Sequence, residues 1–395
     1  MKIKIDKIIL FSFCITLIGN ALDYLHIEIS TGLTYSIMLL PIIVSFVIIL
    51  YLILTKRLVN TKFKYLFEMK WGILVFIVFL IISTIKSIQT DMFTWGTIGE
   101  SIRLLVPFIY VFIIINFLSN AEIEFFMRFC LLVATLCFLI TTDYSNLTMS
   151  NILSISFSNS YSPFENFEVS LLSWATSIYF IYNYRKNKIW CLLSVVLVFL
   201  TFKRVFIIST IILIICVFFK FTTKKINGLI LVLSSLFWIM ASEFYLYLLK
   251  PANYFWTMNT LHFDVVNFSM SRAYRVWYLF QNGFESYGLG STTQYLTKAF
   301  NLGLTGKSLG VTLELDLIKT LMELGILGVT IFVISYFEIT RKNLYSYFVI
   351  SLLFLQLLMA NGLTRYLEFS IILTTIALIH YRFNSEKDAK TVKMK

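Results

Sequence analysis

The longest polar interruption in the chain begins at Lys250 and reads PANYFWTMNTLHFDVVNFSMSRAYRVWYLFQNGFESYGLGS over residues 251–291. It continues to residue 312, and apolar runs lie on both sides of it. Of the 395 residues, 58% are hydrophobic and only 14% are charged. Because so little charge does not suit a water-facing surface, the composition predicts a polytopic membrane protein that presents this one large loop.

The net charge of +12 does not indicate a nucleic-acid partner. The lysines and arginines are spread over short connections between apolar segments, whereas a nucleic-acid surface gathers them on one face. The five cysteines lie inside or beside apolar segments, with no CxxC pair and no histidine at ligand spacing. We interpret them as packing residues and expect neither a metal nor another cofactor.

Apolar segments of nearly membrane-spanning length recur along the chain. A helix needs about 20 mostly apolar residues to cross a bilayer, so we predict an all-α membrane protein with about twelve spans. The predicted segments are residues 8–27, 32–55, 71–90, 102–119, 125–142, 167–184, 189–202, 205–221, 226–249, 317–339, 344–362 and 366–382. The seventh and eighth form one apolar run broken by Lys203 and Arg204, which we interpret as the tight turn of a helical hairpin.

Lysine and arginine also predict the orientation of these segments. If the N-terminus is cytoplasmic, most basic residues of the connections fall on the cytoplasmic side, as the positive-inside bias requires. Both termini are then cytoplasmic, residues 384–395 form a basic tail, and the loop of residues 250–312 faces outward between the ninth and tenth spans. No internal repeat or linker divides the chain, so we treat residues 1–395 as a single integral domain.

Arginines predicted on the outer side are the first candidate functional residues, because they run against this bias. They are Arg103, Arg204, Arg272, Arg275 and Arg365. On a helix, Arg272 and Arg275 would share a face, and guanidinium groups match phosphate oxygens two at a time. A lipid diphosphate is therefore a natural ligand. The alternative is that each arginine reaches lipid headgroups or pairs with an acid, such as Glu100, Glu285 or Glu368.

Glycines and aromatic residues form a second group of candidates in the loop. Gly288 and Gly290, separated by one residue, permit a tight turn with a close backbone approach. They lack the flanking strand of a dinucleotide site, which excludes a Rossmann interpretation. Trp277 and its aromatic neighbours could stack on sugar rings, although anchoring at the membrane interface is the simpler interpretation.

Carboxylates follow at the start of the tenth span. A carboxylate of Glu314, Asp316 or Glu323 could take a proton from a sugar hydroxyl. The alternative is an ion pair with Lys319 or with one of the arginines. After Glu323 the sequence runs Leu-Gly-Ile-Leu-Gly328, and its two glycines, three residues apart, predict close helix contact.

These motifs occur in a recognisable order along the chain. They are Phe202-Lys-Arg204, Ser271-Arg272 followed by Trp277, Gly288-Leu-Gly290-Ser291, Glu314-Leu-Asp316 and Glu323-Leu-Gly-Ile-Leu-Gly328, with Glu100-Ser-Ile-Arg103 to Pro107 further upstream. In this order the sequence resembles the Wzy family of O-antigen and capsular polysaccharide polymerases. The related O-antigen ligases usually have a histidine-asparagine pair where this chain has Glu314 and Leu315, which argues against a ligase.

The resemblance implies a glycosyltransferase of the bacterial cytoplasmic membrane. Its partners would be an undecaprenyl-diphosphate-linked oligosaccharide, membrane lipids and a chain-length regulator protein, with no nucleic acid. It implies that Arg204 and Arg272 hold the diphosphate and that Glu314 or Asp316 activates the acceptor hydroxyl. Residues in contact with substrate would then be Arg103, Arg275, Trp277, Gly288, Gly290, Glu323 and Arg365. The alternatives are a ligase or another polyprenyl-linked glycosyltransferase, and a flippase for lipid-linked oligosaccharides.

Overall fold

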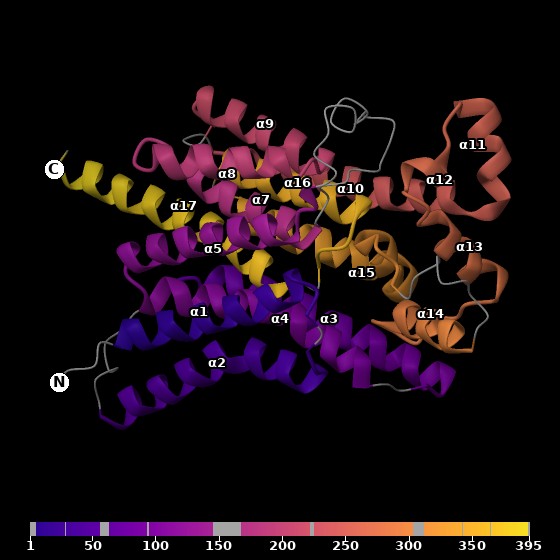
Figure 1. The fold of residues 1–395 in the computed structure, drawn as a ribbon, viewed down its shortest axis with the longest axis horizontal. Coiled ribbons are helices and arrows are strands. Elements are labelled where there is room, and N and C mark those ends of the chain that lie inside the picture. Colours follow the sequence, from indigo (N-terminus) through magenta and orange to yellow (C-terminus); the bar gives the residue numbers. More distant parts are fainter. Residues whose placement is uncertain are drawn as a thin grey trace. The chain divides into compact units, whose positions relative to one another are not determined.

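The computed structural model describes residues 5–27, 29–55, 63–92, 95–144, 167–221, 225–302, 312–341, 343–363 and 365–393 (Figure 1). Within these ranges the regular structure is helical and no residue lies in a strand. The chain divides into two compact units. Unit 1 comprises Met1–Met69, Val106–Lys224 and Leu367–Lys395, and unit 2 comprises Lys70–Leu105 and Lys225–Tyr366. The units interleave along the chain, so neither is one contiguous segment. That residues 1–395 form a single integral domain stays a prediction.

Six of the described helices belong wholly to unit 1, and three more pass from one unit to the other along the chain. The unit 1 helices are α1 (Ile5–Tyr24), α2 (Thr31–Leu54), α5 (Asn120–Thr141), α7 (Phe167–Tyr182), α8 (Lys188–Leu200) and α9 (Arg204–Phe218). The shared helices are α3 (Leu66–Thr90), α4 (Trp95–Phe117) and α17 (Tyr366–Lys393). Unit 2 adds α10 (Gly228–Leu249), η3 (Pro251–Asn253), α11 (Tyr254–Leu261), α12 (Val265–Phe268), α13 (Ala273–Gln281), α14 (Ser291–Asn301), α15 (Asp316–Thr340) and α16 (Leu344–Met359).

Seven of the described helices are long and apolar enough to cross a membrane. They are α1, α2, α3, α4, α5, α10 and α15. Five further apolar helices have 10–17 residues, namely α8, α9, α16 and the apolar parts of α7 and α17. The protein is therefore a helical membrane protein, as the composition predicts. A helix occupies each segment predicted from the sequence, but the crossing of the bilayer by all of them stays a prediction.

Helix α7 is at the core of unit 1, where it packs against α5, α8 and α9. Its Trp174 is fully buried and stacks on Phe206 of α9, with the ring centroids 5.3 Å apart. The hydroxyl groups of Ser173, Thr176 and Ser177 donate to carbonyls of the same helix, as Ser173 Oγ does to Val169 O at 2.6 Å. Small residues that satisfy themselves in this way let neighbouring helices approach closely, which favours association in lipid.

The predicted hairpin at Lys203 and Arg204 is confirmed. Helix α8 ends at Leu200, α9 begins at Arg204, and the two helices are in contact. Phe202 between them has a φ of 51°, a left-handed backbone conformation that turns the chain within three residues.

The connection before α5 and the first turn of that helix contain two acids, Glu122 and Glu124, and no lysine or arginine. Ser119 and Glu122 form a capping box, in which each side chain accepts a hydrogen bond from the other residue's backbone N–H. Glu124 forms an ion pair with Arg128 one turn later. These acids therefore complete the helix and its first turns.

In unit 2, α10 packs along α15, and α15 packs on α16. Aromatic rings fill these contacts. Phe354 of α16 lies 5.6 Å from Phe332 of α15 and 6.0 Å from Trp238 of α10, measured between ring centroids. Each such pair stabilises the packing by about 0.5–1.5 kcal/mol beyond its buried area. The short helices α11 to α14, orange in Figure 1, connect α10 to α15, and they contact both of these helices and one another.

Helix α15 is broken at Gly325, where the backbone has φ 72° and ψ −175°. This conformation is almost exclusive to glycine, because a Cβ atom would clash with the backbone. The prediction of close helix contact at the two glycines is wrong for Gly325, since a Cβ there would have no atom of another described segment within 4 Å. The nearest atoms to such a Cβ at Gly328 belong to Leu324 of the same helix. Gly325 therefore permits a break in α15.

Candidate functional site

Two arginines and one glutamate of unit 2 form the candidate site. The chain turns sharply after α12, because Met270 and Ser271 have φ values of 54° and 64°. Two consecutive left-handed residues without glycine are an uncommon, strained arrangement of the kind that clusters at functional sites. The turn leads directly into Arg272, which immediately precedes α13 and is buried.

Arg272 and Arg275 converge on the carboxylate of Glu314. The Nε and Nη2 atoms of Arg272 both lie 3.0 Å from Glu314 Oε2, and Arg275 Nη1 lies 3.4 Å from Oε1. The predicted common face of the two arginines is thus confirmed. The ion pair also matches the alternative interpretation of Glu314 as the partner of an arginine, whereas Glu100, which the sequence offers as an acid for the arginines, pairs with Lys319. Two guanidinium groups on one carboxylate form a cationic site that suits an anion with several oxygens.

The same arginines also bond to backbone carbonyls. Arg272 Nη1 lies 3.4 Å from both Ser269 O and Met359 O, and Arg275 Nη1 donates to Thr312 O at 2.8 Å. These contacts fix the two guanidinium groups to the turn before α13, to the end of α16 and to the segment before α15. The position of the charges is therefore determined by the fold of unit 2.

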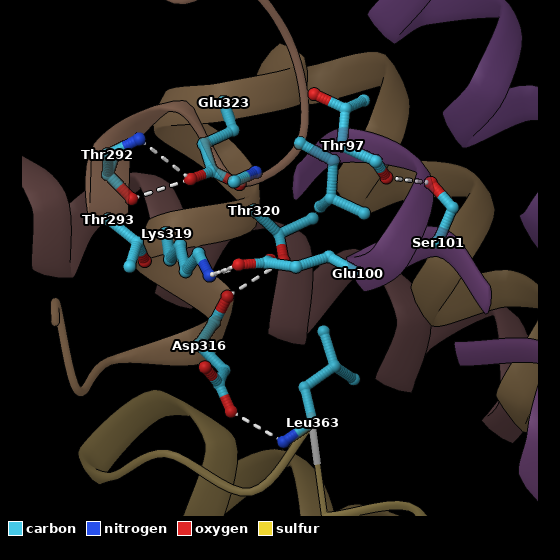
Figure 2. A network of polar contacts seen from close by, with 12 residues as sticks. Thr97, Glu100, Ser101, Thr292, Thr293, Asp316, Lys319, Thr320, Glu323 and Leu363 are labelled. Carbon is cyan, nitrogen blue, oxygen red and sulfur yellow. Dashed lines mark hydrogen bonds and ion pairs between the residues drawn. The ribbon is translucent and has the colours of Figure 1, made fainter. Parts of the chain in front are cut away.

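A second polar cluster lies deeper in unit 2 and contains Lys319 and three carboxylates (Figure 2). Lys319 is buried, and its Nζ donates to both carboxylate oxygens of Glu100, at 2.7 and 3.0 Å. Glu100 comes from α4 and Lys319 from α15, 219 residues later in the chain. A buried charge needs such a partner, because leaving it alone in a low dielectric is costly.

Glu323, also fully buried, binds the beginning of α14. Its carboxylate accepts the backbone N–H groups of Gly290 at 2.8 Å and Thr292 at 3.0 Å, and the hydroxyl of Thr292 at 2.5 Å (Figure 2). The first N–H groups of a helix have no partner within it, and an anion there is stabilised by the helix dipole. Gly290, at the N-cap position of α14, has no side chain, so Glu323 caps the helix instead.

The turn at Gly288 and Gly290 approaches α3 closely, which confirms the prediction from their spacing. A Cβ at Gly288, where φ is 113°, would lie 2.6 Å from the Cβ of Ser83. Ser83 Oγ accepts the N–H of Leu289 at 3.0 Å, so α3 holds the turn directly. Burial, and secondarily the charge of Glu323, raise the pKa of Tyr287. Its hydroxyl keeps its proton and donates to Gln294 at 3.0 Å.

Asp316 holds the connection between α16 and α17. Its buried carboxylate accepts the backbone N–H groups of Gly362 at 2.5 Å and Leu363 at 2.6 Å. These residues follow Met359, whose carbonyl contacts Arg272. Asp316 therefore holds in place the segment that contacts Arg272. Its partners are backbone N–H groups, whereas the partners of Glu314 are the two arginines.

Trp277 packs within the loop. Its indole N–H donates to Leu249 O at 2.8 Å, and its ring meets those of Tyr254 and Tyr274 edge to face, each at 5.2 Å between centroids. These contacts tie α13 to the end of α10. The predicted anchoring of the aromatic residues at the membrane interface stays a prediction.

The remaining predicted site residues lie elsewhere in the two units. Arg103 lies on α4 and Arg365 before α17, both half-buried in unit 2. Arg204 is the first residue of α9 in unit 1. Their roles stay predictions.

Within the described ranges, no group of three or more histidine, cysteine, aspartate or glutamate residues is placed to hold a metal ion. None of the protein families, curated proteins or solved structures compared with this chain matches it. The geometry of unit 2, together with the sequence motifs, is therefore the basis on which a function is proposed.

Proposed function

We propose that this protein is a polysaccharide polymerase of the bacterial cytoplasmic membrane. It transfers a growing glycan from undecaprenyl diphosphate onto a lipid-linked repeat unit at the outer face. In this proposal the chain crosses the membrane about twelve times, as the length of its apolar segments suggests, and both termini are cytoplasmic. Membrane lipids and a chain-length regulator protein are its further partners.

The convergence of Arg272 and Arg275 on one carboxylate carries the proposal. Such a site in a membrane protein suits a lipid diphosphate, whose oxygens accept paired hydrogen bonds from guanidinium groups. The loop between α10 and α15 carries the arginines and precedes an apolar helix long enough to span the membrane. A substrate with a polyprenyl tail would place its diphosphate at such a boundary.

In the proposed reaction, a hydroxyl of the acceptor sugar gives its proton to the carboxylate of Glu314 or Asp316. The hydroxyl oxygen forms a bond with the anomeric carbon of the donor sugar. The bond between that carbon and the phosphate oxygen breaks, and its electron pair leaves with undecaprenyl diphosphate. Arg272 stabilises the charge that develops on the departing diphosphate. The role of Arg204 rests on the sequence resemblance alone.

The test is the length distribution of lipid-linked and surface glycans in a strain that lacks this protein, with the wild-type gene restored as the control. A polymerase predicts single repeat units that accumulate on the outer face of the membrane. Long chains left on the lipid carrier would identify a ligase. Repeat units confined to the inner face would identify a flippase, and either result would overturn the proposal.

A further inference from the structure

Glu314 occupies the cationic site that the proposed function assigns to a substrate anion. Its Oε2 lies between two nitrogens of Arg272, and its Oε1 faces Arg275. While both oxygens engage guanidinium groups, they are poorly placed to accept a proton from a sugar hydroxyl. A base in this position must therefore leave the arginines before it can act.

The arginines have other anchors. Arg272 contacts the carbonyls of Ser269 and Met359, and Arg275 donates to the carbonyl of Thr312. If the carboxylate moves away, these carbonyls still hold the guanidinium groups in place. The cationic site is thus preorganised for an anion that replaces Glu314, without a separate rearrangement of the arginines.

Glu314 itself is placed where it can move. It lies in a short irregular segment before α15, and 32% of its side chain is exposed. Asp316 and Glu323, in contrast, are buried and accept backbone N–H groups of other segments. Of these three carboxylates, Glu314 can exchange its partners at the smallest cost, because water reaches it and its contacts among the described residues are with side chains.

We propose that the diphosphate of the lipid-linked donor displaces Glu314 from Arg272 and Arg275, and that the released carboxylate takes the proton from the acceptor hydroxyl. This inference rests on the proposed function and selects Glu314 over Asp316 as the base. A diphosphate esterified at both ends has a negative charge on each phosphate, which matches the two guanidinium groups better than one carboxylate does. When the donor diphosphate replaces Glu314 on the arginines, the same event frees the carboxylate that activates the acceptor. The base is therefore available only when a donor is bound.

The exchange makes an unusual prediction for Glu314→Gln. The neutral amide competes less strongly for the arginines, so the variant binds diphosphate about three- to tenfold more tightly than the wild type. It also loses polymerisation, since an amide is not a base. A variant that merely folds less well would bind more weakly, so a gain in affinity cannot result from structural damage.

The experiment uses the purified full chain in phosphatidylcholine nanodiscs and measures the Kd for undecaprenyl diphosphate. Glu285→Gln is the matched control, because it removes one negative charge from the same loop and its exposed side chain forms no ion pair within the described part of the chain. Its affinity should equal that of the wild type. Arg272→Ala should weaken binding at least tenfold through loss of a charged, buried contact.

The possible outcomes separate this inference from the proposed function. Equal or weaker binding by Glu314→Gln, with weak binding by Arg272→Ala, would overturn the displacement and leave the polymerase proposal intact. Equal binding by wild type and Arg272→Ala would overturn both. If nanodiscs that contain phosphatidylglycerol abolish binding of undecaprenyl diphosphate, the site recognises ordinary headgroup phosphate, and its assignment to the donor is wrong.

Discussion

The carboxylate of Glu323 accepts two hydrogen bonds from Thr292, one from its backbone N–H at 3.0 Å and one from its hydroxyl at 2.5 Å. The two residues are 31 positions apart in the chain. This pair closes the loop of unit 2 onto α15 and fixes the beginning of α14. The cap therefore links the glycine turn to the helix that begins beside the arginines.

Loss of this cap should destabilise the protein. Glu323→Ala leaves buried N–H groups of Gly290 and Thr292 without an acceptor, at a cost of about 1–3 kcal/mol for each unsatisfied group. Thr292→Val removes only the hydroxyl and should cost about 1 kcal/mol. Thermal unfolding of the purified variants in detergent measures both effects. An unchanged Tm for Glu323→Ala would contradict this role.

The buried pair of Lys319 and Glu100 should be strongly coupled. Lys319→Met leaves the Glu100 carboxylate without its partner, which should lower the free energy of unfolding by about 3–5 kcal/mol. The double variant Lys319→Met/Glu100→Leu should recover part of this loss, because the Glu100 carboxylate is no longer left without its partner. Chemical unfolding of the two single variants and the double variant gives the coupling energy. Simple additivity of the two losses would show that the contact is not energetically important.

Two glycines with positive φ should differ in their tolerance of alanine. Gly325→Ala has open space around the new methyl group and should cost about 1–3 kcal/mol through backbone strain alone. Gly288→Ala adds a clash with the Cα and Cβ of Ser83, at 2.7 and 2.6 Å, and should cost more. Unfolding of both variants under identical conditions tests the order. Equal losses at the two positions would mean that α3 yields to the new methyl group.

Chain growth should require the planar guanidinium groups of Arg272 and Arg204 as well as their positive charge. Arg272→Ala or Arg204→Ala should stop chain growth while the protein remains folded in the membrane. Lysine at either position should restore growth only in part, because it cannot form the paired hydrogen bonds of a guanidinium group. Glycan length in complemented deletion strains is the measurement, and Arg185→Ala, at an exposed arginine of unit 1, is the control. Normal polymer from both alanine variants at normal expression would remove Arg204 and Arg272 from the mechanism.

Local features of this molecule follow well from its sequence. The apolar runs predict where the helices lie, because a helix in lipid must be long and apolar whatever it packs against. The turn before Arg204 also follows, since it depends on residues within one short segment. The spacing of Gly288 and Gly290 predicts a close approach there, but it does not identify Ser83 of α3, over 200 residues away, as the residue that approaches.

Contacts between distant segments do not follow in the same way. The sequence offers Glu100, Glu285 and Glu368 as acids for the arginines, yet Arg272 pairs with Glu314, while Glu100 binds Lys319. Every one of these pairs satisfies the same electrostatic rule, and only the packing of α4, α13 and α15 selects among them. The role of Glu323 as a helix cap is hidden for the same reason, because α14 begins 32 residues before it, at Ser291.

The break at Gly325 divides α15 into two helical parts connected by one residue without a side chain. A continuous helix keeps one axis from its first turn to its last. At Gly325 the helical backbone geometry is interrupted, so the part that begins at Asp316, near the loop that carries Arg272, and the part that packs against Phe354 have separate axes.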